Sequence, residues 1–240
     1  LLTVVDDPDS SMEDIANVIQ YDPVITASVL KTCNSAFFGL KHPAESVKDA
    51  VNMLGTDQVV ELVLLKSGAK ALSGKQEGYG LEGDDMWRYS VSSAVIAKQV
   101  AIKLGLKNKN TIFTAALVKD IGKILLEKYV ARSSGKIRTL VENKNLSFRE
   151  AEKTILGIDH AELGAMIAKM WKFSSKMIKI IKHHHMSDET KIKDKEIAAV
   201  YLADCICMMI GNGVGSDGLS YRFKEQAMKE LDITADDVAM

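Results

Sequence analysis

Apolar residues recur every three or four positions along most of the chain. Such stripes include Ile15, Val18 and Ile19; Val59, Leu62, Val63 and Leu65; and Val91, Ala94 and Val95. Because this spacing matches the 3.6 residues of a helical turn, each stripe predicts one face of a helix that packs on a core. Convincing runs of alternating apolar and polar β-branched residues, which would indicate strands, are absent. The pattern therefore predicts an all-helical protein.

Polar residues and glycines mark where these helices begin and end. Capping-box spacing, in which two side chains satisfy backbone N–H groups at a helix start, occurs at Ser11 with Asp14, Ser46 with Asp49, Ser147 with Glu150, and Asp159 with Glu162. Helix ends are predicted at Gly39, Gly55, Gly105 and Gly157, each of which follows an apolar stripe. Several separate helices follow from these signals.

One glycine-rich stretch divides the chain. Residues 73–85 contain four glycines and few apolar side chains, so we expect an exposed linker or long loop there. This places an amino-terminal helical subdomain in residues 1–75 and a helical bundle in residues 76–211. Residues 212–240 then form a carboxy-terminal extension, with a short charged helix around Lys224 to Leu231.

The composition narrows the partners that the protein would have. The chain has 31 basic and 32 acidic residues, which leaves no global attraction to nucleic acid or to an anionic membrane. The longest apolar runs, such as Val59 to Leu65, are shorter than the roughly 20 residues that span a bilayer. We therefore expect a cytoplasmic protein that binds neither membrane nor nucleic acid. Because the chain begins at Leu1 within an apolar segment, we also expect it to be part of a longer protein.

The histidines are the most informative chemical feature. The chain has five, and four of them, His160, His183, His184 and His185, lie within 26 positions. Imidazole is the most common ligand for transition metals and the usual acid or base near neutral pH. Three cysteines (Cys33, Cys205 and Cys207) lack the spacing of a zinc site or a disulfide framework and are interpreted as buried thiols.

Two aspartates stand in apolar helical contexts where an unpaired carboxylate would be costly. They are Asp120 in AALVKDIGKILL and Asp204 in AVYLADCICMMI. One interpretation brings Asp120, Asp204 and the histidines together in a pocket that binds a metal ion or a phosphate. In the alternative, Asp120 pairs with a lysine, Asp204 caps or bonds a neighbouring helix, and the histidines form a solvated helix end.

Several segments in the same order resemble the motifs of one protein family. VKDIGKILL resembles the central helix of the HD superfamily of metal-dependent phosphohydrolases, in the form found in its HDOD (HD-related output domain) branch. The other matching segments are DPVITASVLKTCNSAFFGL, SVKDAVNMLG, MWRYS, GIDHAELGAMI, IIKHHH and YLAD. Together they cover roughly Leu2 to Gly211, and as an ordered set they identify the chain as similar to HDOD domains.

The resemblance implies an HD-domain-like helical bundle packed against an amino-terminal HDOD-specific helical subdomain. It also implies a regulatory domain in bacterial signal transduction, with regulatory or signalling protein domains as partners. HDOD domains are generally regarded as non-catalytic relatives of the HD enzymes. We therefore expect a binding or output module that is not an enzyme.

The chain departs from the catalytic HD pattern at two ligand positions. Tyr89 stands where the first histidine ligand is expected, and Lys119 replaces the histidine of the His-Asp doublet. A neutral phenol and an ammonium, with reference pKa values near 10, are poor ligands at pH 7. Asp120, His160, His184 and Asp204 match the remaining ligand set, although which of His183, His184 and His185 aligns stays open.

These departures predict a degenerate metal site with no cofactor. Our hypothesis is that the Lys119 ammonium replaces the metal electrostatically and pairs with Asp120, Asp204 or both. One alternative is a residual metal-dependent phosphohydrolase or phosphodiesterase acting on a nucleotide, with a divalent metal on Asp120, His160, His184 and Asp204. A second alternative is a binder of a nucleotide or another phosphorylated ligand.

Overall fold

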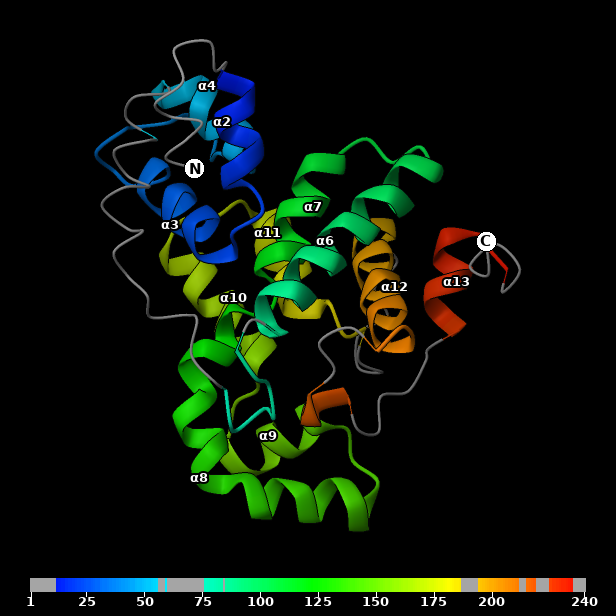
Figure 1. The fold of residues 1–240 in the computed structure, drawn as a ribbon. Coiled ribbons are helices and arrows are strands. Elements are labelled where there is room, and N and C mark those ends of the chain that lie inside the picture. The colour runs from blue at the N-terminus through cyan, green and yellow to red at the C-terminus, as the bar shows by residue number, and fades with distance from the viewer. Residues whose placement is uncertain are drawn as a thin grey trace.

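The computed structural model describes residues 12–55, 59, 76–83, 85–186, 194–211, 215–218 and 225–234. Within these residues the regular structure is helical, and the single extended pairing is an isolated bridge between Gln76 and Leu81 (Figure 1). The prediction of an all-helical fold is confirmed. Among the helices of the described part of the chain, none combines the length and the apolar character needed to cross a membrane.

Three helices form the amino-terminal part of the described chain: α2 (Met12–Ile19), α3 (Pro23–Cys33) and α4 (Val47–Leu54). The Asp22 side chain caps α3 by accepting hydrogen bonds from the Val24 and Ile25 N–H groups at 2.9 Å. Ser46 caps α4 through the Asp49 N–H group, as its spacing predicted. The proposed Ser11 cap lies outside the described residues.

The remaining helices build the bundle. They are α6 (Asp85–Lys103), α7 (Lys109–Val118), α8 (Ile121–Lys144), α9 (Phe148–Leu156), α10 (His160–Met170), α11 (Ser175–His183) and α12 (Lys195–Met209), followed by the 3-10 turn η1 (Ser216–Gly218) and α13 (Glu225–Leu231). The expected capping box at Ser147 and Glu150 is present at the start of α9. The expected carboxy-terminal helix is also present as α13, which packs on α12.

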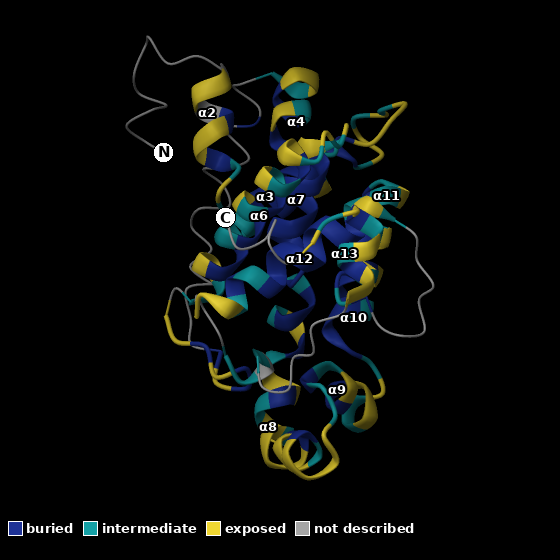
Figure 2. Ribbon diagram, turned by 90° about the vertical axis from the view of Figure 1, so that its right-hand side faces the viewer, coloured by how far each residue is buried: buried dark blue, intermediate teal, exposed yellow. Residues whose placement is uncertain are grey.

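Helix α7 lies at the centre of the fold. Every residue from Thr111 to Val118 is buried, because α6, α11, α12 and α3 pack around this helix. In Figure 2, α7 and α12 form a buried region in the middle of the molecule. Burial on all sides explains why α7 has no polar face and why its threonines, Thr111 and Thr114, are also enclosed.

The turn from α7 to α8 contains only Lys119 and Asp120. At the start of α8, Gly122 lies against the first turn of α10, where an added Cβ atom would come 2.0 Å from the His160 carbonyl oxygen. No side chain fits at this distance, so the glycine allows the two backbones to touch. This close contact fixes the α7–α8 turn next to the start of α10.

A second, smaller core lies between α8, α9 and residues 76–83, which we call the strap. Its buried members include Tyr79, Leu81, Leu126, Val130, Ile137, Val141, Phe148 and Ala151. The expected exposed linker over residues 73–85 is therefore wrong for half of the strap: Gln76, Gly78, Tyr79 and Leu81 are buried, while the other four positions are exposed.

Among the strap glycines, Gly78 is buried and serves close packing, whereas Gly80 and Gly83 are exposed. A Cβ atom on Gly78 would lie 2.6 Å from the Ala131 backbone nitrogen, so the strap backbone rests directly on α8. On the other side, the Ser216 N–H group donates a 2.7 Å hydrogen bond to the Tyr79 carbonyl oxygen. The glycine content thus predicted the irregular backbone of the strap correctly. Whether the strap is buried depends instead on contacts with α8 and Ser216, which lie far along the chain.

Candidate functional site

The structure brings together the six residues that the sequence marked as a degenerate site. Tyr89 lies on α6, Lys119 and Asp120 form the α7–α8 turn, and His160 begins α10. His184 follows the last turn of α11, and Asp204 lies on α12. All six are at most 6% exposed. A buried group of this kind must satisfy its charges and hydrogen bonds internally.

One half of the site, the lysine half, joins ammonium groups to carboxylates. The Lys119 Nζ atom contacts the Asp120 carboxylate and lies 2.8 Å from Asp204 Oδ1. The Tyr89 hydroxyl donates to the same Asp204 oxygen at 2.6 Å, and its ring centroid lies 4.5 Å from Lys119 Nζ. Lys119 therefore bridges both aspartates, which is one of the arrangements that the hypothesis from the sequence allowed.

A second lysine completes this half and was missed in the sequence. Lys123 Nζ lies 3.0 Å from Asp120 Oδ1 and 5.7 Å from the ring centroids of both Tyr79 and Tyr89. The signal was available, because Lys123 follows Asp120 by three positions in a helix. With Lys123 included, two ammonium groups balance two carboxylates and the lysine half is formally neutral.

The charges in the lysine half stabilise one another. Burial alone would raise the pKa of Asp120, but Lys119 and Lys123 outweigh it and hold this pKa well below its usual value. Burial likewise opposes ionisation of Asp204, whose pKa Lys119 lowers overall. For Lys119, the effect of burial is overcome by Asp120 and Asp204, so its pKa is raised. Both aspartates and Lys119 are therefore charged near neutral pH.

The other half of the site, the histidine half, begins with a buried carboxylate on α9. Glu152 is 0% exposed and its Oε2 atom lies 2.6 Å from His160 Nδ1, while Tyr79 OH donates to Oε1 at 2.5 Å. Burial alone would lower the pKa of His160, but Glu152 reverses this and raises it. For Glu152, His160 and Tyr79 outweigh burial and lower the pKa. Neither Glu152 nor Tyr79 was singled out in the sequence, since only tertiary packing places them here.

Two members of the histidine run complete this half. His185 Nε2 lies 2.7 Å from His160 Nε2, and His184 Nδ1 lies 2.7 Å from the Ile181 carbonyl oxygen, to which it donates. His184 Nε2 is buried without a hydrogen-bond partner among the described residues. Burial lowers the pKa of His184 to about 4 and places that of His185 well below its usual value. His183 and His185 are both partly exposed, but His185 contacts His160 and lies with His184 beside it, so His184 and His185 are the two that face the site.

The resemblance to HD enzymes implies a divalent metal ion, and the two halves differ in how they would receive one. In the lysine half, both carboxylates are engaged by Lys119, and a cation would meet two ammonium groups, so this half does not fit a divalent metal. In the histidine half, ligand nitrogens of His160, His184 and His185 lie within 4.8 Å of one another. These three offer donors typical of transition metals, provided that the His160–His185 hydrogen bond breaks. The ligand set expected from the sequence is therefore divided between the halves, and His185 joins it.

Comparison with known proteins identifies the fold. The family model for the HDOD domain matches residues 1–187. The chain belongs to the HDOD family. The match covers every member of the two halves except Asp204, which α12 contributes from beyond it.

Related proteins agree with this assignment of the HDOD fold. The MmoQ response regulator from Methylococcus capsulatus str. Bath superposes with a TM-score of 0.76 at 20% identity, over 99% of this chain and 92% of that one. An HDOD domain protein with unknown function from Geobacter sulfurreducens gives a TM-score of 0.54 at 25% identity, over 99% and 79% of the two chains.

One curated relative of this HDOD chain is an uncharacterized protein of Treponema pallidum (strain Nichols). It is 21% identical over 184 residues, which make up 75% of this chain. The match spans about a third of that relative, 35% of its length. The family model therefore defines the family and the solved structures support the fold, while the chemistry of this HDOD domain depends on its own residues.

Proposed function

We propose that this HDOD domain is a non-catalytic binding or output module of signal transduction, whose HD-like site is held together by lysines in place of a metal ion. The observation that carries the proposal is the position of Lys119 between Asp120 and Asp204. An ammonium group supplies positive charge to these carboxylates. It has no vacant coordination position at which water could be activated.

The charge balance of the lysine half supports the same proposal. Lys119 and Lys123 neutralise Asp120 and Asp204 without any further ion. Removing one member of such a buried group leaves a charge uncompensated, which makes the group a constraint on how α7, α8 and α12 meet. A site of this kind stabilises one arrangement of the bundle, as an output module requires. Its partners would be regulatory or signalling protein domains that contact the helical surface.

Metal analysis with restored ligands tests this function. Purified wild-type protein, dialysed against iron, manganese or zinc, is expected to retain far less than one equivalent of metal. The double variant Tyr89→His with Lys119→His returns two imidazoles to the lysine half and removes one ammonium, so we expect it to retain more metal than wild type. Stoichiometric metal in the wild-type protein would overturn the proposal.

A second function has support from one specific feature. The three imidazoles of His160, His184 and His185 lie close enough to share one ion, which favours a residual phosphohydrolase or phosphodiesterase acting on a nucleotide. If this alternative holds, wild-type protein loaded with metal hydrolyses a phosphodiester or a nucleotide, and His184→Gln abolishes both metal binding and turnover. Lys128→Gln, on the exposed surface of α8, is the control that should retain both.

A further inference from the structure

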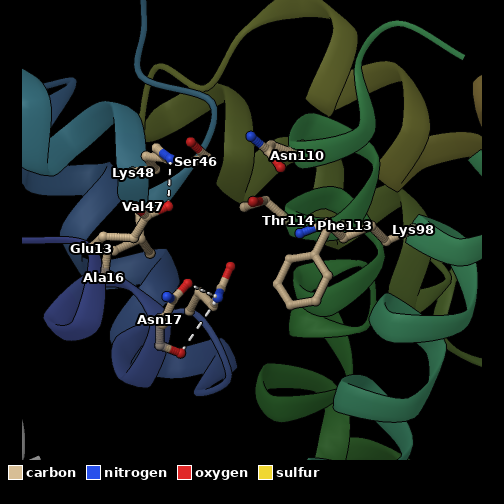
Figure 3. A pocket seen from close by; sticks show the side chains of 11 residues that line it. Glu13, Ala16, Asn17, Ser46, Val47, Lys48, Lys98, Asn110, Phe113 and Thr114 are labelled. Carbon is tan, nitrogen blue, oxygen red and sulfur yellow. Dashed lines mark hydrogen bonds and ion pairs between the residues drawn. The ribbon is translucent and has the colours of Figure 1, made fainter. Parts of the chain in front are cut away.

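A polar cleft lies where the amino-terminal helices face the bundle, away from the two halves of the HD-like site. It has a volume of about 100 Å³ and is lined by α2 and the start of α4 on one side, and by α6 and α7 on the other (Figure 3). Pockets for drug-sized ligands usually measure at least about 300 Å³. The cleft therefore has room for one small polar group and not for a whole nucleotide.

The two walls of the cleft differ in how far their polar groups are satisfied. On the α2–α4 wall, Lys48 Nζ pairs with Glu13 Oε1 at 2.9 Å, and Gln20 donates to Asn17 at 2.9 Å. On the α7 wall, Asn110 and Thr114 have side chains without a hydrogen-bond partner in the described part of the chain. Thr114 is only 3% exposed, yet its hydroxyl is turned toward the cleft (Figure 3). This hydroxyl is therefore available as a donor or acceptor to a group bound in the cleft.

The charge around this hydroxyl favours an anion. Lys98 lines the cleft with its Nζ atom 5.5 Å from the Phe113 ring centroid, and Glu13 is already paired with Lys48. The lining side chains thus carry one net positive charge. Helix α4 also begins here, and Ser46 caps only its Asp49 N–H group. The N–H groups of Val47 and Lys48 have no intrahelical partner and stay available to an acceptor.

We infer that this cleft binds the oxyanion group of a small ligand, either a phosphate or a carboxylate. The oxygens would accept hydrogen bonds from Thr114, from the Asn110 amide and from the first turn of α4, while Lys98 supplies the opposite charge. Because these groups come from both sides of the cleft, the bound anion joins the amino-terminal helices to the bundle. The cleft shares no residue with the lysine half or the histidine half, so it does not depend on the function proposed for them.

Titration with two simple anions tests the site. Inorganic phosphate and acetate are added separately to isotopically labelled protein at constant ionic strength, with chloride as the reference, and amide shifts are followed by NMR. We expect saturable shifts at Val47 and Thr114 with at least one of the two. A response to phosphate alone identifies a phosphorylated ligand as the class, and a response to acetate alone identifies a carboxylate. No saturable shift with either anion would overturn the inference.

Matched variants separate this site from general effects of salt and charge. Lys98→Gln and Thr114→Val should each weaken binding of the responding anion about tenfold, since each removes one interaction with a charged ligand. Lys136→Gln and Thr139→Val make the same changes on the exposed surface of α8 and should leave the affinity unchanged. Thr114→Ser keeps the hydroxyl and should retain binding, which distinguishes a lost hydrogen bond from a disturbed helix. Equal weakening by the control variants would contradict the proposed site.

Discussion

The two halves of the HD-like site satisfy buried polar groups in different ways. In the lysine half, Lys119 and Lys123 pair directly with Asp120 and Asp204, and the charges cancel. In the histidine half, Glu152 holds His160, while burial keeps His184 neutral with one nitrogen unpartnered among the described residues. In the lysine half, all charges are paired. In the histidine half, imidazole nitrogens remain that could bind a proton or a metal ion.

This difference means that the two halves are held by separate sets of contacts. In the lysine half, the Lys119 ammonium holds Asp120 and Asp204 by charge attraction. It does not affect imidazoles held by other elements, because His160 is oriented by Glu152 on α9. Substitutions in the two halves should therefore have different consequences.

The largest effect should come from removing the central charge of the lysine half. Lys119→Met leaves Asp120 and Asp204 buried with only Lys123 as a nearby ammonium, and we expect a loss of about 3–5 kcal/mol in the free energy of unfolding. Urea denaturation measures this loss. Lys128→Met removes the same charge from an exposed position on α8 and should change stability by less than about 0.5 kcal/mol. A loss below about 1 kcal/mol for Lys119→Met would show that the two ion pairs contribute little.

The histidine half should make the free energy of unfolding depend on pH. Burial lowers the pKa of His184 from 6.5 to about 4, so the unfolded chain binds a proton between these values that the folded protein does not. Unfolding is therefore favoured as the pH falls from 6.5 to 4, by on the order of 3 kcal/mol. Urea denaturation over this range, with a chelator present, should show a shallower pH dependence for His184→Gln than for wild type. Equal slopes would mean that His184 is protonated in the folded protein.

A smaller effect is expected where the strap joins the histidine half. Tyr79→Phe removes the hydrogen bond to Glu152 and should cost about 2 kcal/mol, since its acceptor is a buried carboxylate. The same change should raise the pKa of Glu152, which an NMR titration can follow. Tyr129→Phe on the exposed face of α8 is the control and should be nearly neutral. If both variants have the same stability, the strap does not support the site.

The sequence identified as site candidates those polar residues that stand in apolar helical segments or in an unusual cluster. Asp120 and Asp204 stood out as carboxylates in apolar helices, and His160 and His184 as members of a histidine cluster. Charge and family pattern predicted that Lys119 pairs with Asp120, Asp204 or both, and in the structure it contacts both. The helix boundaries were predicted where a cap has a local cause, as at Ser147 and Glu150.

The missed residues depend on contacts between distant parts of the chain. Glu152 lies on a short amphipathic helix among other charged side chains, and nothing local distinguishes it from its exposed neighbours. Tyr79 lies in a glycine-rich segment, a composition that indicates irregular backbone without saying whether that backbone is buried. Trp87 on α6 shows the opposite case, because this large apolar side chain is 47% exposed. Periodicity gives the face of a helix, whereas the packing of other elements decides which face is covered.

The hydrogen bond between Tyr89 and Asp204 joins residues 115 positions apart. Contacts with such long sequence separation are costly to form early in folding, because a long loop must close before they contribute. We therefore expect the lysine half to assemble last, after α7 and α8 have formed and α12 has joined them. Until then its carboxylates and ammonium groups stay hydrated. The lysine half would thus be complete only when the carboxy-terminal helices of the bundle are in place.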